Sequence, residues 1–525
     1  MKTSSTLILC FFIALFSSCN KDLGNYDYIE ADSLLVTNLK DTIDIKLGEN
    51  LKITPNLASK TNQINQENLS FEWVAYDKSQ VEASQKRKIL STKKDIDVLP
   101  VLTIGTYPVY LSITDNETGS IWTYPFTLNI KGAYQKYGWF VLSDIADKGH
   151  LSFIEDNPEK WNSYPKTYHD FQNVLFSELD GSPLAINGKP KSLVNHTNMN
   201  AVVRAAKNYL YINTSEGTTL INVSDGMLYN PSKYTFLNET ASGNPTSADR
   251  EFVFTAGSAM AMKNGDLYSM QYTMQTYYNV PVNNEASGKT YKLSPFVALP
   301  MGNGGGNILL FDSEAKRFMT YKHGSARAAA LSSEGQAIDV TDTQMDLVWM
   351  GHTLAFDGQA IAVMKDKAGK LFLLRMTYTA NAVFRVESLT ELDATFTDIN
   401  QAKHFAVDNL YGYFFYATDN KLYQYDLDAK VLKLAKDYAG RKITLLKAPH
   451  QAALKPGTPT FTKYQERLEP ILFSILVGSN TESAPTNSGK LEVLRVSPLM
   501  GPLKESFKPF EGMGKIVDAV YIDNA

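Results

Sequence analysis

The sequence predicts an all-β protein in which an immunoglobulin-like sandwich is followed by a β-propeller of about seven blades. Two observations indicate this fold class. The chain has 29 Tyr and 26 Phe but only two Cys, and aromatic residues suit pleated, half-buried strands. Short apolar segments bounded by turn residues recur along the chain, and from about residue 133 they repeat with a period of roughly 50 residues.

The first 18 residues have the pattern of a secretory signal peptide. A positive start precedes an apolar stretch over residues 7–16, and two small residues follow it. The apolar stretch is too short for a membrane-spanning helix of about 20 residues. Cys19 comes next, so the order resembles the lipobox of bacterial lipoproteins, with Phe16 in place of the usual Leu. The resemblance implies cleavage before Cys19 and anchoring to outer-membrane lipid through chains on that cysteine. The alternative is a plain secretory signal with a stray cysteine.

Cysteine count and charge limit the chemistry of the mature chain. Cys10 leaves with the signal peptide and lipid occupies Cys19, so no disulfide, zinc–thiolate site or cysteine nucleophile remains. The net charge is −4 and no basic block appears, so we expect no nucleic-acid partner. At 525 residues, the chain is long enough for two or more domains with cores of their own.

The residues after the cysteine divide into a tether and two domains. Residues 19–33 are polar and predict a lipidated tether, residues 34–132 the sandwich, and residues 133–525 the propeller. Within the sandwich, turn residues separate the expected strands at 34–36, 51–55, 70–75, 105–114 and 120–130.

Two local patterns support the sandwich. Val109, Leu111 and Ile113 alternate with more polar neighbours, which places one face of their strand inward. Residues 115–119 then predict a hairpin turn into the last strand. Trp73 fits the core tryptophan of such a sandwich better than the alternative, a carbohydrate-stacking platform.

Several motifs resemble the PKD-like lipoproteins of Bacteroidota. The resemblance is carried by Gly24–Tyr28, Phe71–Trp73, Gly105–Tyr107, Thr114–Asp115 and Gly514–Tyr521. It implies an outer-membrane lipoprotein, exposed at the cell surface, that accompanies SusC/SusD-type nutrient importers. These motifs mark the family and say little about the ligand.

The repeats after residue 133 predict the propeller. We expect blades to begin near residues 137, 195, 257, 293, 350, 402 and 448. The chain ends on a lone strand, residues 515–522, and the first repeat begins in the middle of a blade at Tyr137. Pairing the last strand into the first blade would close the ring and remove exposed edges. The blade near 293 is poorly marked, which leaves six or eight blades open, and a second set of sandwiches is the alternative fold.

No catalytic motif appears in the sequence. It has no His-Glu-x-x-His and no Gly-x-Ser-x-Gly motif. The glycine-rich segment 302–307 lacks the Lys-Ser/Thr and the helix of a phosphate loop, so it predicts a hairpin or loop. We therefore assign no catalytic residue, no metal and no cofactor.

Histidines and aromatic residues are the candidate ligand contacts. His196, His352 and His404 precede predicted inner strands, so they would cluster at one mouth of the channel and bind a metal or an anion. Separate hydrogen-bonded histidines are the favoured alternative, and we predict no metal site. The other candidates are Tyr272, Tyr277 and Tyr278 in a long connection, which suits binding, and Trp349 beside His352, for which a core role is favoured.

The sequence is compatible with three functional hypotheses. The leading hypothesis is a non-catalytic surface lipoprotein that binds a nutrient or braces a SusC/SusD-type importer, with a glycan, a peptide or an iron chelate as ligand. A propeller hydrolase or lyase acting on a polymer is the second, because propeller active sites rarely show motifs. An adhesion or envelope-structural protein is the third. The sandwich is expected to act as a spacer, so changes at Lys86 or Arg87 should affect binding little.

Overall fold

A computed structural model describes most of the chain after the tether, and its contacts divide the protein into two compact units. The first unit holds most of the sandwich. The second unit runs from Asn129 to the C-terminus and includes two short segments, Asp44–Leu51 and Leu99–Thr106. The described residues are 33–60, 64–78, 83–132, 138–155, 166–177, 181–200, 205–223, 228–229, 250–254, 258–271, 280–299, 307–322, 324–379, 383–449 and 459–522.

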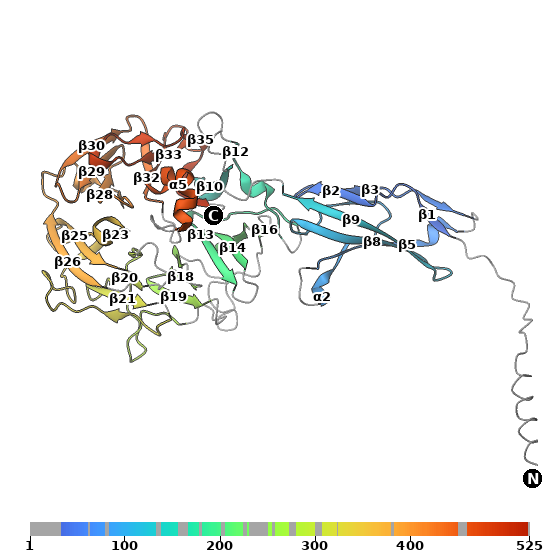
Figure 1. The fold of residues 1–525 in the computed structure, drawn as a ribbon, viewed down its shortest axis with the longest axis horizontal. Helices are drawn as coiled ribbons and strands as arrows, with labels where there is room; N and C mark the ends of the chain where they lie inside the picture. The colour runs from blue at the N-terminus through green and yellow to red at the C-terminus, as the bar shows by residue number, and fades with distance from the viewer. Residues whose placement is uncertain are drawn as a thin grey trace, which may run out of the picture. The chain divides into compact units, whose positions relative to one another are not determined.

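The sandwich is built around one five-stranded sheet with the order β2-β9-β8-β5-β6 (Figure 1). Two short pairs, β1-β4 and β3-β7, complete it. The strands are β1 (Leu34–Val36), β2 (Thr42–Lys46), β3 (Leu51–Ile53), β4 (Leu57–Ser59), β5 (Leu69–Tyr76), β6 (Arg87–Ser91), β7 (Ile96–Val98), β8 (Gly105–Asp115) and β9 (Ile121–Lys131), with the short helices η1 (Gln66–Asn68) and α2 (Ala83–Lys86) between them.

Alternation along β5 and β8 produces the core of the sandwich. Val109, Leu111 and Ile113 are fully buried, as the period of two predicted. Trp73 is also fully buried, its indole Nε1 donates to the Lys93 carbonyl at 2.9 Å, and its ring meets Phe126 edge to face. The core role of Trp73 is therefore confirmed, and its ring is not available for stacking on a ligand.

The predicted hairpin between β8 and β9 is also confirmed. Asp115 Oδ1 accepts the backbone N–H of Glu117, and Oδ2 accepts the Thr118 hydroxyl. Gly119 adopts φ +73°, which a residue without Cβ tolerates best. These local bonds lower the pKa of Asp115, chiefly through the Glu117 N–H, so the carboxylate caps the turn as an anion.

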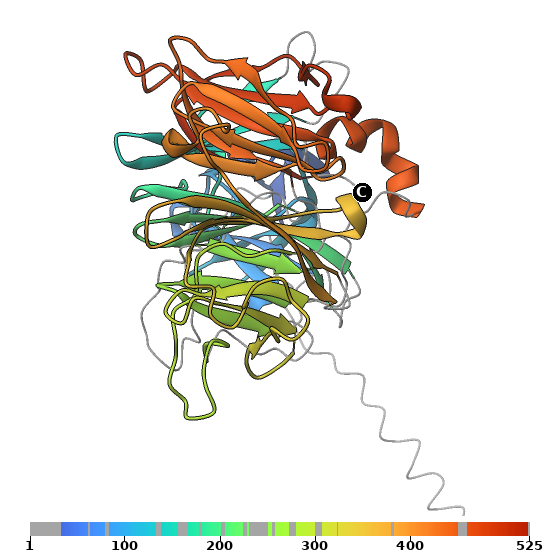
Figure 2. The ribbon, with the colours of Figure 1, turned by 90° about the vertical axis from the view of Figure 1, so that its left-hand side faces the viewer.

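The described residues of the second unit form seven antiparallel sheets, as the fold prediction expected. Figure 1 shows them following one another around a ring, and Figure 2 shows the same ring turned by 90°. The first strands of most neighbouring sheets contact one another, so these strands line the ring's centre. We number the sheets as blades 1 to 7 in chain order, and the sheet of the lone C-terminal strand is blade 1.

The blades contain between three and five strands each. Blade 1 has β36 (Lys515–Ile522), β10 (Gly138–Ile145), β11 (Lys148–Glu155) and β12 (Thr167–Tyr168); blade 2 has β13 (Pro190–Asn200), β14 (Ala205–Thr214), β15 (Thr218–Asn222) and β16 (Leu228–Tyr229); blade 3 has β17 (Arg250–Phe254), β18 (Ser258–Lys263) and β19 (Asp266–Gln271); blade 4 has β20 (Asn307–Asp312), β21 (Arg317–Lys322) and β22 (Ala329–Ala330).

The remaining three blades follow the same pattern. Blade 5 has β23 (Asp346–Thr353), β24 (Gln359–Lys365), β25 (Leu371–Tyr378) and β26 (Phe384–Glu391); blade 6 has β27 (His404–Val407), β28 (Tyr413–Ala417), β29 (Lys421–Asp426) and β30 (Leu432–Asp437); blade 7 has β31 (Lys442–Lys447), β32 (Ser474–Asn480), β33 (Gly489–Arg495), β34 (Lys504–Glu505) and β35 (Phe510–Met513). The helices are α5 (Pro459–Leu472) and the short η2 (Phe171–Val174), η3 (Ala355–Asp357), η4 (Ile399–Gln401) and η5 (Pro498–Met500).

The last strand closes the ring, as predicted. β36 pairs antiparallel with β10 from Gly138 opposite Ile522 to Asp144 opposite Lys515. Asp518 of β36 also reaches both neighbouring blades, because its Oδ1 accepts from Lys447 Nζ at 2.8 Å and its Oδ2 from the Leu193 N–H at 3.0 Å. The two ends of the propeller are therefore joined by a β-ladder and by one shared carboxylate.

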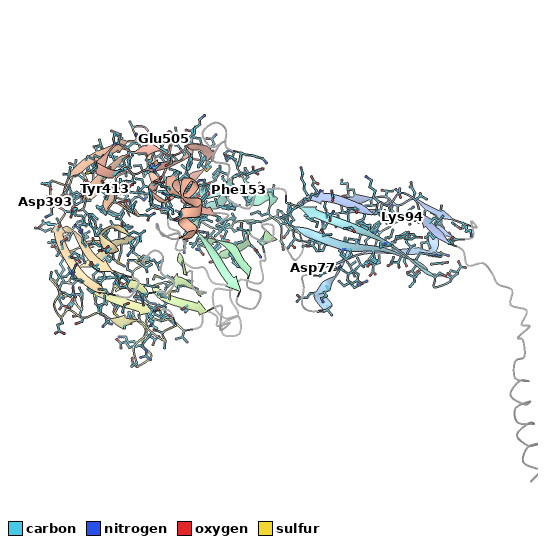
Figure 3. All side chains as sticks on the ribbon, viewed as in Figure 1. Asp77, Lys94, Phe153, Asp393, Tyr413 and Glu505 are labelled. Atoms are coloured by element: carbon cyan, nitrogen blue, oxygen red, sulfur yellow. The ribbon has the colours of Figure 1, made fainter. Side chains whose placement is uncertain are left out.

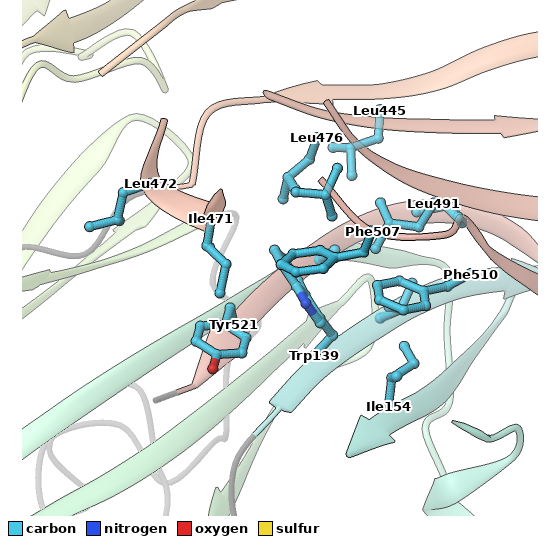
Figure 4. Close-up of a cluster of buried hydrophobic side chains, with 14 of the residues drawn as sticks. Trp139, Ile154, Leu445, Ile471, Leu472, Leu476, Leu491, Phe507, Phe510 and Tyr521 are labelled. Atoms are coloured by element: carbon cyan, nitrogen blue, oxygen red, sulfur yellow. The ribbon is translucent and has the colours of Figure 1, made fainter. Parts of the chain in front are cut away.

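Apolar side chains fill the space between adjacent blades. Figure 4 shows the cluster between blades 7 and 1, where the fully buried Trp139 is surrounded by other aromatic rings. Its ring centroid lies 5.2 Å from that of Tyr521 and 6.4 Å from that of Phe510. Ile471 from α5 packs into the same cluster. Similar clusters lie between blades 1 and 2, blades 3 and 4, blades 4 and 5, blades 5 and 6, and blades 6 and 7.

Three details differ from the sequence prediction. The strand that begins at Ser258, β18, was expected to be the inner strand of blade 3. It is the second strand of that blade, because β17 pairs with β18 on its inner side. The blade expected near residue 293 begins later, at Asn307, because residues 290–299 form isolated bridges such as Leu293 to Asp312. The helix α5 was not predicted, because it interrupts the repeat between two strands of one blade.

Candidate functional site

Most of the predicted ligand contacts lie outside the part of the chain that can be described. Tyr272, Tyr277 and Tyr278 fall among the residues that are not described, as does Cys19, the predicted lipidation site. His196 belongs to β13, but its side chain is not described. The roles of these residues therefore stay predictions.

His352 and His404 lie on the first strands of blades 5 and 6. His352 is next to the last residue of β23, and its Nε2 lies 3.0 Å from the Tyr378 carbonyl. His404 is the first residue of β27. The joint role of these histidines at one mouth of the channel stays a prediction.

Burial determines the charge of His404. Its half-buried position lowers its pKa, since the protonated ring loses water, and the Ile443 backbone and Asp419 only partly oppose this effect. The ring is therefore neutral at pH 7, which leaves it a hydrogen-bonding group rather than a cation.

Trp349 packs between blades 5 and 6. Its ring centroid lies 6.2 Å from that of Phe405 and 6.1 Å from that of Phe414, and the three residues belong to one hydrophobic cluster. These contacts agree with the core role that was favoured for this residue over ligand binding.

A hollow with the character of a binding site lies on the sandwich, on the outer face of its large sheet. Its volume is about 520 Å³. The side chains that line it come from β5, β6, β8 and β9, from the turn that follows β5 and from the end of α2: Glu72, Val74, Tyr76, Asp77, Lys78, Lys86, Arg87, Pro108, Tyr110, Ser112 and Thr123. We call this feature the sandwich hollow. Figure 3 shows the side chains of the sheet, with Asp77 labelled.

Strand register explains how the sandwich hollow forms. Trp73 points into the core, so Glu72, Val74 and Tyr76 point to the opposite face. Val74 pairs with Tyr110 on one side and with Ile89 on the other, and only 4% of its surface is exposed. The aromatic and aliphatic side chains beside it therefore cover this valine and form an apolar floor on a face that would otherwise be solvated.

Two tyrosines form an aromatic pair beside this floor. The ring centroids of Tyr76 and Tyr110 lie 5.6 Å apart with the planes at 89°, an edge-to-face arrangement that aromatic pairs prefer. Tyr76 is 38% exposed and Tyr110 is half-buried. Each ring is held by its neighbour, so the pair presents aromatic surface to solvent at low entropic cost.

An ion pair lies in the same hollow. Arg87 Nη2 lies 2.5 Å from Glu72 Oε2, and the side chains of the two residues are 42% and 37% exposed. Glu72, and to a lesser extent Tyr76, raise the pKa of Arg87, so the guanidinium is firmly cationic. An exposed pair of this kind contributes little to stability. It places planar donors and acceptors beside the tyrosines, which is an arrangement suited to recognising a polar ligand.

The sandwich hollow was not predicted from the sequence. Lys86 and Arg87, at which changes were expected to affect binding little, both line it. The available signal was the polar and aromatic alternation of residues 72–76 and 108–112, in which Glu72, Tyr76, Tyr110 and Ser112 share the face opposite the core. That pattern identifies the face, but not which side chains of other strands lie next to it.

The described part of the chain lacks a metal cluster and a membrane-spanning helix. Among the described residues, no three His, Cys, Asp or Glu side chains are placed to hold a metal ion. Within the same residues, no helix has the length and apolar character needed to cross a membrane.

Comparisons with known proteins identify the N-terminal region. The model of the PKD-like family matches residues 19–190. No curated protein matches the chain significantly. A quinoprotein alcohol dehydrogenase-like protein of Bacteroides thetaiotaomicron is 13% identical, with 93% of this chain and 99% of that chain covered and a TM-score of 0.44.

Two other solved structures are more distant. The extracellular domain of a putative hybrid two-component system of B. thetaiotaomicron is 12% identical over 63% of this chain and 35% of that chain, with a TM-score of 0.35. Dipeptidyl peptidase 4 of Porphyromonas gingivalis is 9% identical over 70% of this chain and 52% of that chain, with a TM-score of 0.32. The family match over residues 19–190 shows that the N-terminal part of the chain is similar to the PKD-like family, and the described sheets show that a β-propeller follows the sandwich along the chain.

Proposed function

We propose that this protein is a lipid-anchored, non-catalytic binding protein of the cell surface, which captures a nutrient or braces a SusC/SusD-type outer-membrane importer. The sandwich hollow is the observation that carries the binding function. It combines an aromatic pair, an apolar floor and an ion pair on an open sheet face. Ligand sites typically combine apolar walls with a few well-placed polar groups.

The N-terminus supports the location. The signal peptide followed by Cys19 motivates lipid anchoring, and two or more acyl chains on one residue give stable membrane attachment. Cys19→Ala should therefore release the protein from membranes. Retention of this variant in the membrane fraction after a carbonate wash would contradict lipid anchoring, and protease accessibility on intact cells tests surface exposure separately.

Binding and turnover are separated by one screen of the purified protein. The probes are neutral and acidic oligosaccharides, peptides and iron chelates, with calorimetry for binding and product analysis for cleavage. Saturable binding without product supports the proposal. Product formation would favour the second candidate, a propeller hydrolase or lyase. Binding to none of these probes, together with no co-purification of an importer, would favour an adhesion or structural role.

The propeller offers a second candidate ligand surface. The connection bearing Tyr272, Tyr277 and Tyr278 stays a proposal, because long connections in compact repeats are often functional. Truncating a binding tyrosine typically costs about 2 kcal/mol, or about 30-fold in affinity. A Tyr277→Ala, Tyr278→Ala variant with unchanged affinity would remove this connection from the site.

A further inference from the structure

We infer that the sandwich hollow binds an uncharged, hydroxyl-rich ligand, a segment of a neutral oligosaccharide chain. This inference rests on the proposed binding function and names its ligand class. It assigns the sandwich a role in recognition, beyond that of a spacer. The charge balance of the hollow, its aromatic pair and its position on the sheet support this ligand class.

The charges in the hollow nearly cancel. Glu72 and Arg87 neutralise each other at 2.5 Å. Of the remaining lining residues, Lys78 and Lys86 carry positive charge and Asp77 negative charge, so the hollow as a whole has one net positive charge. A charged ligand would have to compete with one partner of the ion pair, whereas a sugar hydroxyl can both donate to Glu72 and accept from Arg87 without separating them.

The tyrosines supply the second element of recognition. Sugar rings present patches of C–H groups, and these pack on the faces of aromatic rings. The edge-to-face geometry of Tyr76 and Tyr110 turns one ring by 89° from the other, so the two rings offer differently oriented surfaces to one bound segment. Ser112 and Thr123 add hydroxyl groups to the same lining. The combination of apolar faces and neutral hydrogen-bonding groups matches the amphiphilic surface of a sugar.

The position of the hollow favours a chain lying across the sheet over a peptide added to its edge. A peptide that extends a sheet uses the free N–H and C=O groups of an edge strand, here β6. Most of the lining residues are instead side chains from four adjacent strands. The aliphatic side chains in the lining are those of Val74 and Pro108, which are too small to anchor a large apolar peptide side chain.

The test is titration calorimetry of the full-length mature protein, with four neutral hexasaccharides as probes: cellohexaose, maltohexaose, xylohexaose and mannohexaose. Oligogalacturonate is the charged probe, and a casein digest is the peptide probe. We expect at least one neutral probe to bind, with an affinity that changes by less than about twofold between 50 and 500 mM NaCl, because no ion pair is formed with the ligand.

Variants locate the site. Tyr76→Ala, Tyr110→Ala should weaken binding by at least about 30-fold, whereas Tyr110→Phe, which keeps the ring, should stay within about threefold of the parent. Ile121→Ala and Lys94→Ala are controls on exposed side chains of the same sandwich outside the hollow, and should bind like the parent. Near-UV circular dichroism checks that each variant is folded.

Each remaining outcome counts against one specific claim. Neutral probes that bind equally to the parent and to the folded double variant overturn the assignment to the hollow, while the proposed binding function stands. Binding only of oligogalacturonate, or only of peptides, overturns the ligand class. Binding of no probe overturns this inference, and co-purification with an importer would then still support the bracing role in the proposed function.

Discussion

Asp518→Ala should be among the most destabilising single substitutions at the seam of the propeller. The carboxylate accepts hydrogen bonds from Lys447 Nζ at 2.8 Å and from the Leu193 N–H at 3.0 Å, and only 12% of the side chain is exposed. Hydrogen bonds to charged groups contribute about 1.5 to 3 kcal/mol each, and breaking a buried pair costs about 3 to 5 kcal/mol. Lys447 is 33% exposed and can regain water, so the lower end applies, about 3 kcal/mol.

The assay is urea unfolding followed by tryptophan fluorescence. Trp139 lies in the cluster between blades 7 and 1, next to the seam, and therefore reports its opening. A double-mutant cycle with Lys447→Met isolates the ion-pair contribution, for which we expect about 1 to 2 kcal/mol of coupling, part of the cost of breaking a buried pair. Glu391→Ala is the control, because its pair with Lys370 in blade 5 is 42% and 57% exposed and should contribute at most about 1 kcal/mol. A loss for Asp518→Ala no larger than that of the control would refute the reasoning, as would strict additivity with Lys447→Met.

Three further predictions follow from the propeller. Deleting residues 514–525 should cause aggregation, measured by size-exclusion chromatography with light scattering, because β10 loses its inner partner and becomes an exposed edge; a monomeric, equally stable deletion would contradict this. Asp408→Ala should cost about 3 kcal/mol, seen as a clear drop in Tm, because the fully buried carboxylate accepts N–H groups of Leu410, Tyr411 and Tyr413 that would be left without a partner. Because burial lowers the pKa of His404, the folded state binds fewer protons than the unfolded state below about pH 6.5, and the stability of the protein should fall as the pH drops through that range. The variant His404→Gln should therefore flatten the dependence of Tm on pH between about 7.5 and 5.5. An unchanged slope would exclude His404 as the source of this dependence.

The sequence was most informative where a strand alternates or repeats. Residues 107–114 alternate strictly, and the strand, its inward face and the following hairpin were all predicted. The start of blade 6 was predicted near residue 402, and β27 begins at His404; apolar residues mark β28 and β29 of this repeat and turn residues separate them. Closure by residues 515–522 followed from counting strands, since an incomplete first blade and a lone last strand complement each other.

Other elements had weak or misleading local signals. β2 has the sequence Thr-Ile-Asp-Ile-Lys and no fully buried residue, so only its place at the end of the sheet order makes it a strand. Residues 290–299 carry the residue types of strands, yet tertiary contacts leave them with isolated bridges. In both cases pairing with a distant segment decides the outcome, because strand propensity depends strongly on context.

The sandwich hollow shows why a site of this kind escapes sequence analysis. Alternation along β5 shows that Glu72 and Tyr76 share a face, and alternation along β8 gives the same result for Tyr110. The hollow exists only because register places Val74 between Tyr110 and Ile89 and sets Tyr76 opposite Arg87, and a shift by one residue would send each of these side chains to the other face. Register follows from core packing on the opposite side, where the buried Trp73 lies. The residues that determine the position of the hollow are therefore core residues that never touch the ligand, so substitutions in that core should alter binding even where the lining of the hollow is unchanged.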